Sequence, residues 1–111
     1  MSAPFQFTQQ AAKDLDEIWW FIAEDNRDAA DRVEREIVAT CRRLAKHPLM
    51  GIKRRDITRL PVRFWTVTKF PNYVIVYRPE MSPLQVIAVL HGRRDLKEVL
   101  EGRPNDAPEG S

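Results

Sequence analysis

Residues 73–90 read YVIVYRPEMSPLQVIAVL and give the clearest indication of the fold. Two runs of mainly β-branched and aromatic residues flank a turn that contains two prolines, a pattern typical of paired strands. The runs at 73–78 and 84–90 are almost continuously apolar, so both faces of their sheet should be covered by other elements. Because only the short segment from Pro79 to Pro83 joins them, we predict that the two strands pair antiparallel.

Two further strands are predicted outside this stretch. Residues 62–70 precede a Pro71-Asn72 turn and would extend the sheet as an antiparallel meander. Near the N-terminus, Phe5-Gln6-Phe7-Thr8 alternates apolar and polar side chains, as expected of a short half-buried strand. Residues 49–60, around Gly51, are expected to form a basic loop.

A helical layer is predicted on one face of this sheet. Two segments carry apolar residues at helical spacing: Ala11, Leu15, Ile18, Trp19 and Ile22, then Ala30, Val33, Ile37, Cys41 and Leu44. Asp25-Asn26 separates the two segments, and Pro48 ends the second because it pushes the preceding residue out of the α region. The very short link predicts an antiparallel helical hairpin.

The C-terminal end is predicted to form a short helix and a tail. Asp95 and Glu98 have the spacing of a capping box, and Gly102 would close the helix. Residues 103–111 are rich in Pro, Gly and polar side chains, which is typical of a flexible tail. We therefore expect one α+β domain over residues 1–102, with the helical hairpin packed on a small antiparallel sheet, and a flexible tail over residues 103–111.

Composition excludes several classes of protein. No apolar run approaches the roughly 20 residues needed to cross a bilayer, and the first residues lack the features of a signal peptide. Cys41 is alone and is expected to be buried, and no His/Cys/Asp cluster has zinc spacing. We expect a cytoplasmic protein with no metal, no cofactor, no membrane partner and no small-molecule substrate.

Positive charge is concentrated in the middle of the chain. Residues 1–26 carry a net charge of −4, residues 27–63 carry +6, and the remainder is balanced. Within residues 42–63, eight basic residues are accompanied by a single acid, Asp56. This segment includes Lys53, Arg54, Arg55 and Arg59, and its charge favours an anionic partner, either nucleic acid or an acidic polypeptide. For any single residue of the segment, a solvated loop position is the simpler interpretation.

Four motifs occur in an order that makes the chain recognisable. They are AKDLDEI (12–18) with FIA (21–23), LAKHPLMG (44–51), YVIVYR (73–78) and VLHGRRD (89–95). Together they resemble the RelE/ParE superfamily of toxins from type II toxin–antitoxin systems, and ParE-type toxins in particular. The resemblance implies a RelE-like fold, a growth-arresting activity, and a cognate ParD-like antitoxin that neutralises the toxin in a hetero-oligomer.

The superfamily has two activities, and the resemblance carries both as alternatives. RelE-type members cleave mRNA at the ribosome, whereas ParE-type members are reported to poison DNA gyrase. RelE-type nucleases have an Arg beside the tyrosine of the central strand and a Tyr near the C-terminus, and these positions hold Val74 and Leu100 here. The Arg after the last strand is matched by Arg94 or its neighbour Arg93. The Glu and the C-terminal His-Tyr pair that other members use are not matched either.

A replacement nuclease set is conceivable from His91, Tyr77 and Glu80. The simpler interpretation gives His91 a structural or partner contact and lets Tyr73 and Tyr77, on one face of their strand, pack against the helices. Arg93 and Arg94 follow a buried strand, where they could contact a target or serve only as capping charge beside Asp95 and Glu98. We therefore predict no catalytic residue and assign target binding to Arg93, Arg94 and His91.

Trp19-Trp20-Phe21-Ile22 places four bulky apolar residues on consecutive helical positions. If Trp19 and Ile22 face the sheet, Trp20 is rotated by about 100° and should be partly exposed. An exposed tryptophan is a credible interface anchor, although it could also pack over the loops. We predict that Trp20, with Phe21 and Trp19, binds the antitoxin.

The sequence thus favours a ParE-like toxin that binds DNA gyrase, with the basic loop and the Arg93-Arg94 end facing the gyrase–DNA complex. The first alternative is a ribosome-dependent endoribonuclease. The second is a member that binds its antitoxin but has lost toxicity.

Overall fold

The structure is a computed structural model that describes residues 3–92 and 96–103. The elements follow in the order β1 (Phe5–Phe7), α1 (Gln9–Ala23), α2 (Arg27–Lys46), β2 (Arg63–Thr66), β3 (Tyr73–Arg78), β4 (Leu84–His91) and α3 (Leu96–Glu101). The predicted α+β class and the predicted order of elements are confirmed.

The four strands of the described residues form one sheet in the order β1-β4-β3-β2. The predicted antiparallel meander is correct for β2, β3 and β4, but β1 pairs with β4 in parallel, so the sheet is mixed. A β-bulge interrupts the β3–β4 ladder, because Val76 pairs with Ala88 while Tyr77 pairs with Val86. Ile87 is therefore the extra residue on β4, and it turns the strand locally.

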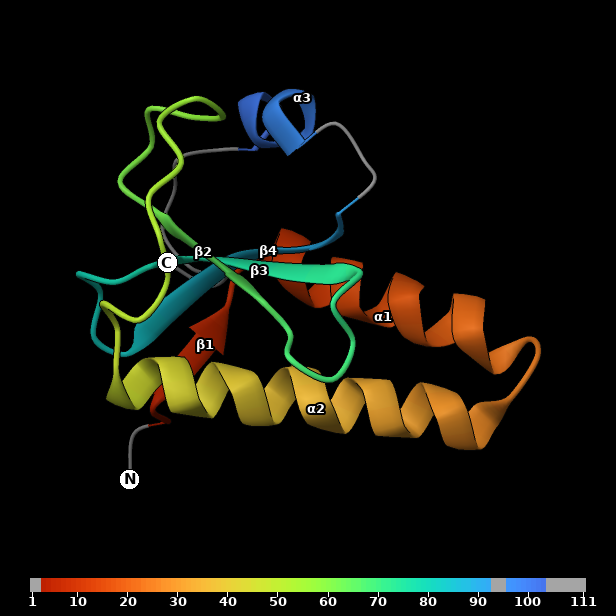
Figure 1. Ribbon diagram of the computed structural model, residues 1–111. Helices are drawn as coiled ribbons and strands as arrows, with labels where there is room; N and C mark the ends of the chain where they lie inside the picture. The colour runs from red at the N-terminus through yellow and green to blue at the C-terminus, as the bar shows by residue number, and fades with distance from the viewer. Residues whose placement is uncertain (1–2, 93–95, 104–111) are drawn as a thin grey trace.

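The sheet separates two apolar layers (Figure 1). The helical hairpin of α1 and α2 covers one face, where Leu15, Ile37 and Tyr77 belong to the first core. The loop after α2 and helix α3 lie over the other face, where Phe64, Leu90 and Leu100 belong to the second core. This double coverage explains why residues 84–90 of β4 are all buried.

The helical hairpin follows the predicted stripes closely. Thr8 and Asn26 cap the two helices, each accepting a hydrogen bond from the backbone N–H three residues later. The stripe predicted for the second helix is buried throughout, and α2 ends before Pro48 as expected. Burial raises the pKa of the Cys41 thiol to about 12, so this cysteine is an inert core residue.

The first strand of the meander is shorter than predicted. The sequence favoured a strand over residues 62–70, whereas β2 ends at Thr66. The Val67 N–H donates to the Tyr73 carbonyl, and the Phe70 N–H donates back to the Val67 carbonyl. These bonds close the connecting loop early, so the apolar residues Val67 and Phe70 fill the first core from a loop instead of a strand.

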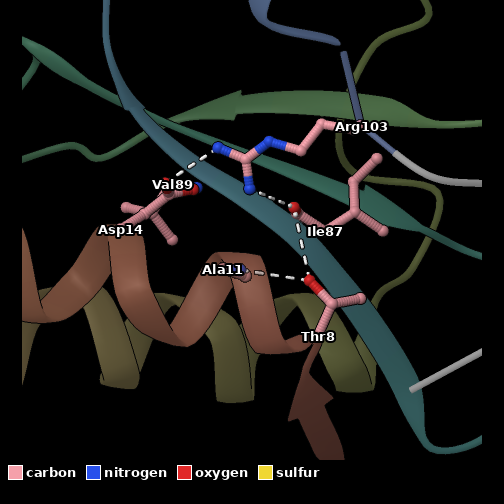
Figure 2. A network of polar contacts seen from close by, with 6 residues as sticks. All are labelled: Thr8, Ala11, Asp14, Ile87, Val89 and Arg103. Atoms are coloured by element: carbon pink, nitrogen blue, oxygen red, sulfur yellow. Dashed lines mark hydrogen bonds and ion pairs between the residues drawn. The ribbon is translucent and has the colours of Figure 1, made fainter. Parts of the chain in front are cut away.

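Arg103, which the sequence assigned to the flexible tail, is held against the domain (Figure 2). Its guanidinium donates to Asp14 Oδ1 at 2.8 Å and to the Ile87 carbonyl at 3.3 Å. The other carboxylate oxygen of Asp14 accepts the Val89 N–H at 3.0 Å. The side chains of this ion pair are 9–10% exposed, so the packed part of the chain extends at least to Arg103.

We expect Asp14→Ala to destabilise the fold by about 3 kcal/mol, because it removes the counter-ion of the Arg103 guanidinium and the acceptor of the buried Val89 N–H. The free energy of unfolding in urea measures the loss. Asp16→Ala, an exposed position on the same helix, is the matched control and should change stability by less than about 0.5 kcal/mol. Equal stability of the two variants would contradict a structural role for the ion pair.

Candidate functional site

An apolar surface lies on the outer side of α1, formed by Trp19, Trp20 and Phe21 and called here the α1 surface. The side chains of Trp20 and Phe21 are 62% and 75% exposed, while Ile18 and Ile22 turn toward the first core. The predicted exposure of Trp20 is confirmed. Such exposure of two aromatic side chains side by side is typical of an interaction surface.

Trp19 does not join the core stripe, which corrects the sequence prediction. Its indole N–H donates to Asp31 Oδ1 at 2.9 Å, so the ring bridges α1 and α2 near the surface. It also packs edge-on against Trp20, with ring centroids 5.1 Å apart. The polar end of an indole needs a partner, and Asp31 supplies it outside the core. Trp19 is therefore fixed to α2 and packs against the Trp20 ring.

A hollow of about 300 Å³ connects the α1 surface to the end of β4. It is lined by Asp14, Glu17, Ile18, Phe21, Tyr73, Val89 and His91. The His91 ring packs edge-on against Tyr73 at a centroid distance of 5.6 Å, and burial raises the pKa of the Tyr73 hydroxyl. His91 was assigned to target binding and Phe21 to antitoxin binding, yet both line the same hollow.

His91 lies far from Tyr77, another residue of the conceivable nuclease set. Tyr73 of β3 pairs with His91, and Tyr77 lies four residues farther along the same strand, about 13 Å at roughly 3.3 Å per residue. The Tyr77 hydroxyl donates to the Pro48 carbonyl at 2.7 Å and accepts the Gly51 N–H at 2.9 Å. Glu80 lies in the turn beyond β3 and lines a hollow beside the basic loop. The structure does not bring the three together.

Val74 and Leu100, which the resemblance to RelE-type toxins placed at two nuclease positions, lie in or against the second core. Leu100 is 1% exposed in that core, and Val74 is half-buried against it. Both side chains are apolar, so they can neither transfer a proton nor stabilise a phosphorane. Burial raises the pKa of the Tyr77 hydroxyl, and its two hydrogen bonds hold the segment from Pro48 to Gly51 in place.

The predicted basic loop forms a protruding segment over residues 53–61, called here the basic ridge. All four predicted residues, Lys53, Arg54, Arg55 and Arg59, are exposed. Arg54 donates to both carboxylate oxygens of Asp56, at 3.0 and 2.7 Å, and these hydrogen bonds lower the pKa of the Asp56 carboxyl. Within the ridge, Asp56 therefore neutralises Arg54, whereas Lys53, Arg55 and Arg59 form no ion pair with the described residues.

Two of the predicted target-binding residues, Arg93 and Arg94, lie outside the described residues. Among residues 3–92 and 96–103, no group of three or more His, Cys, Asp or Glu could hold a metal ion. No helix in that part of the chain is long and apolar enough to cross a membrane.

Sequence reasoning missed Asp14, Arg103 and Lys97. Asp14 lies between Ala11 and Ile18 on the edge of an apolar stripe, which is an available signal for a buried, paired carboxylate. No pattern in the sequence indicates a role for Arg103 or Lys97, because the contacts of both residues depend on where α3 packs. Lys97 lines a hollow together with the basic ridge.

Comparison with known proteins identifies a family. Residues 5–96 match the family described as ParE toxin of type II toxin-antitoxin system, parDE. A solved structure described as "Chromosomal ParDE TA system from P. aeruginosa" is similar with a TM-score of 0.65 and 20% sequence identity, covering 78% of this chain and 92% of that chain. At this identity the likeness shows the fold alone. Comparison with curated proteins gives no significant match.

We expect Tyr77→Phe to reduce the free energy of unfolding by about 1–3 kcal/mol, since the Gly51 N–H and the Pro48 carbonyl lose a buried partner. Tyr73→Phe is the matched control, because the Tyr73 hydroxyl makes no hydrogen bond to the described residues, and it should change stability by less than about 0.5 kcal/mol. Chemical denaturation of both variants provides the measurement. A stable Tyr77→Phe protein would show that these hydrogen bonds do not hold the loop.

Proposed function

The chain belongs to the ParE toxin family of type II toxin–antitoxin systems, and from this we propose that it arrests bacterial growth by binding and poisoning DNA gyrase in the cytoplasm. The observation that carries a binding mechanism is that core hydrophobics, Val74 and Leu100, occupy two of the three nuclease positions. The separation of His91 from Tyr77 supports the same view, because proton transfer needs groups within hydrogen-bond reach of one substrate.

We propose that a ParD-like antitoxin covers the α1 surface. Trp20 and Phe21 present a large apolar area on a helix. Trp19 packs edge-on against Trp20 and is fixed by its hydrogen bond to Asp31. Aromatic anchors on a rigid support lose little conformational entropy on binding, which is why they dominate interface energetics. Asp16 and Glu24 flank this area, so the antitoxin segment that packs there should be apolar with basic or neutral edges.

Neutralisation then follows from the shared hollow. An antitoxin side chain that packs on Phe21 would also enter the hollow that His91 lines. His91 is the last residue of β4, and Arg93 and Arg94 follow it in the chain. We propose that His91, Arg93 and Arg94 contact the target, so that antitoxin on the α1 surface blocks this end of β4 directly.

Trp20→Ala and Phe21→Ala should each raise the Kd of the antitoxin at least tenfold, about 1.4 kcal/mol or more, because each removes an exposed aromatic anchor. Isothermal titration calorimetry with the purified antitoxin measures the change. Met81→Ala is the matched control, since Met81 is an exposed apolar residue in the turn at the other end of β4. An unchanged Kd for both aromatic variants would place the antitoxin elsewhere.

The proposed target is tested by incubating the antitoxin-free toxin with gyrase, ATP and relaxed plasmid. We expect blocked supercoiling and protein-linked linear DNA, both reversed by antitoxin. Arg93→Ala/Arg94→Ala should keep antitoxin affinity but lose the block, because it removes two cations from the target-facing end. Normal supercoiling by a folded toxin that still arrests growth and cleaves mRNA within codons would replace this proposal with the ribosome-dependent nuclease.

A further inference from the structure

The basic ridge is a rigid, anchored structure. The N–H groups of Ile57 and Thr58 both donate to the Arg54 carbonyl, at 2.9 and 3.0 Å, and close a tight turn. The Thr58 hydroxyl accepts the Leu60 N–H at 3.1 Å. Ile57 and Leu60 pack against the second core, so the apolar side of the ridge is fastened to the sheet while its cations face outward. The fold therefore defines the backbone positions from which these cations project.

A hollow lies on each flank of the ridge among the described residues. The hollow toward α3 has a volume of about 780 Å³, and Lys97, Leu100 and Glu101 form its far wall. The hollow on the other flank has about 150 Å³, and Arg63, Pro79 and Glu80 form its far wall. Arg55 and Arg59 line both hollows. The same two guanidinium groups can therefore serve either flank.

The charge available to a ligand in these hollows is positive. Arg54 is neutralised by Asp56, and the Arg63 guanidinium donates to the Leu49 and Gly51 carbonyls. Lys53, Arg55, Arg59 and Lys97 make no ion pair with the described residues. Glu80 and Glu101 are the remaining carboxylates of the described walls. The cations exceed these acids, so an anionic ligand is favoured on both flanks.

The chemistry of the hollows favours phosphate over an acidic protein surface. Apolar residues such as Ile57, Leu60 and Leu100 line the hollows, but they are half-buried or buried against the second core. The large exposed apolar side chains of the described residues line neither hollow: Trp20, Phe21, Leu49, Ile52 and Met81. A protein partner needs an apolar centre to its interface, whereas a nucleic acid backbone is bound by charge and hydrogen bonds alone. Guanidinium groups match phosphate oxygens with two parallel hydrogen bonds.

We propose that the basic ridge binds the phosphate backbone of double-stranded DNA, with the ridge facing a groove and one strand in each flanking hollow. The two strands of B-DNA border grooves about 6 and 12 Å wide, so a ridge with cations on both flanks meets two rows of phosphates at once. The inference rests on the proposed function for its setting, because gyrase holds a duplex. It assigns DNA binding to the ridge and gyrase binding to the end of β4.

The test uses full-length toxin freed from antitoxin, a fluorescent duplex of arbitrary sequence, and no gyrase. Anisotropy titrations at several salt concentrations give the Kd and its salt dependence. Wild-type toxin should bind with a Kd of about 1–100 μM at physiological salt, as expected of contacts to the backbone alone. Arg55→Gln/Arg59→Gln should weaken binding by roughly tenfold or more at low salt and reduce the slope of log K against log salt by roughly 2.

The matched control is Arg32→Gln/Arg35→Gln, which removes the same charge from exposed positions on α2, on the opposite face of the sheet. This control should bind DNA like the wild type. Equal losses in the two double variants would mean that net charge alone is responsible, and absence of binding by the wild type would show that the ridge does not contact DNA. Either result overturns the inference.

The supercoiling assay separates this inference from the proposed function. DNA binding that depends on Arg55 and Arg59, together with a toxin that leaves gyrase unaffected, would sustain the ridge assignment and overturn the gyrase proposal. A wild-type toxin that blocks gyrase and does not bind the duplex would sustain the gyrase proposal and overturn the ridge assignment. If the ridge variant also loses affinity for gyrase in the absence of DNA, the ridge contacts protein and the DNA assignment is wrong.

Discussion

Side chains cap the backbone polar groups along one edge of β4, and this capping ties the other elements of the fold together. β4 is buried along most of its length, so each of its backbone polar groups needs a partner. β1 is only three residues long and pairs with Leu84–Val86, and beyond it side chains satisfy the edge. Thr8 and Arg103 donate to the Ile87 carbonyl, while Asp14 accepts from the Val89 N–H (Figure 2). One short stretch of edge therefore joins α1, β4 and the segment after α3, which are far apart in sequence.

This arrangement places the α1 surface and the basic ridge on opposite faces of the sheet. The hairpin fastened by Asp14 holds the α1 surface on one face, and the segment fastened by Arg103 holds α3 beside the basic ridge on the other. The end of β4 at His91 lies next to the α1 surface, because Phe21 lines the same hollow. Under the proposals above, antitoxin and DNA would approach from opposite faces. Of the two proposed target-binding regions, antitoxin would directly cover the end of β4 and not the basic ridge. Arg103 lies beyond residues 5–96, the part that matches the family, so this fastening involves a segment outside the match.

The sequence was sufficient for features that depend on periodicity or on local capping. The stripe on α2, the extent of β3 and the exposure of Trp20 all follow from spacing along a single element. Features that depend on which elements meet in space were not accessible. The parallel pairing of β1, the ion pair between Asp14 and Arg103, and the position of Trp19 each join residues that are distant in sequence. An apolar pattern also cannot distinguish a strand from a loop that packs inward, which is why β2 was predicted too long.

The chain that leads into the basic ridge is held by a core residue, Tyr77. Gly51 has no space for a side chain, because an added Cβ would lie 2.6 Å from the Tyr77 hydroxyl oxygen. Because of this close approach, the Tyr77 hydroxyl forms hydrogen bonds with both Pro48 and Gly51. An antiparallel β-bridge to Phe64 holds the next residue, Ile52. Arg63 closes the other end of the loop by donating to the Gly51 carbonyl. Because both ends of the loop are fixed to the sheet, the backbone that carries its cations is positioned before any ligand binds. A preorganised cluster loses less entropy on binding, so Tyr77 contributes to the ridge without lying on it.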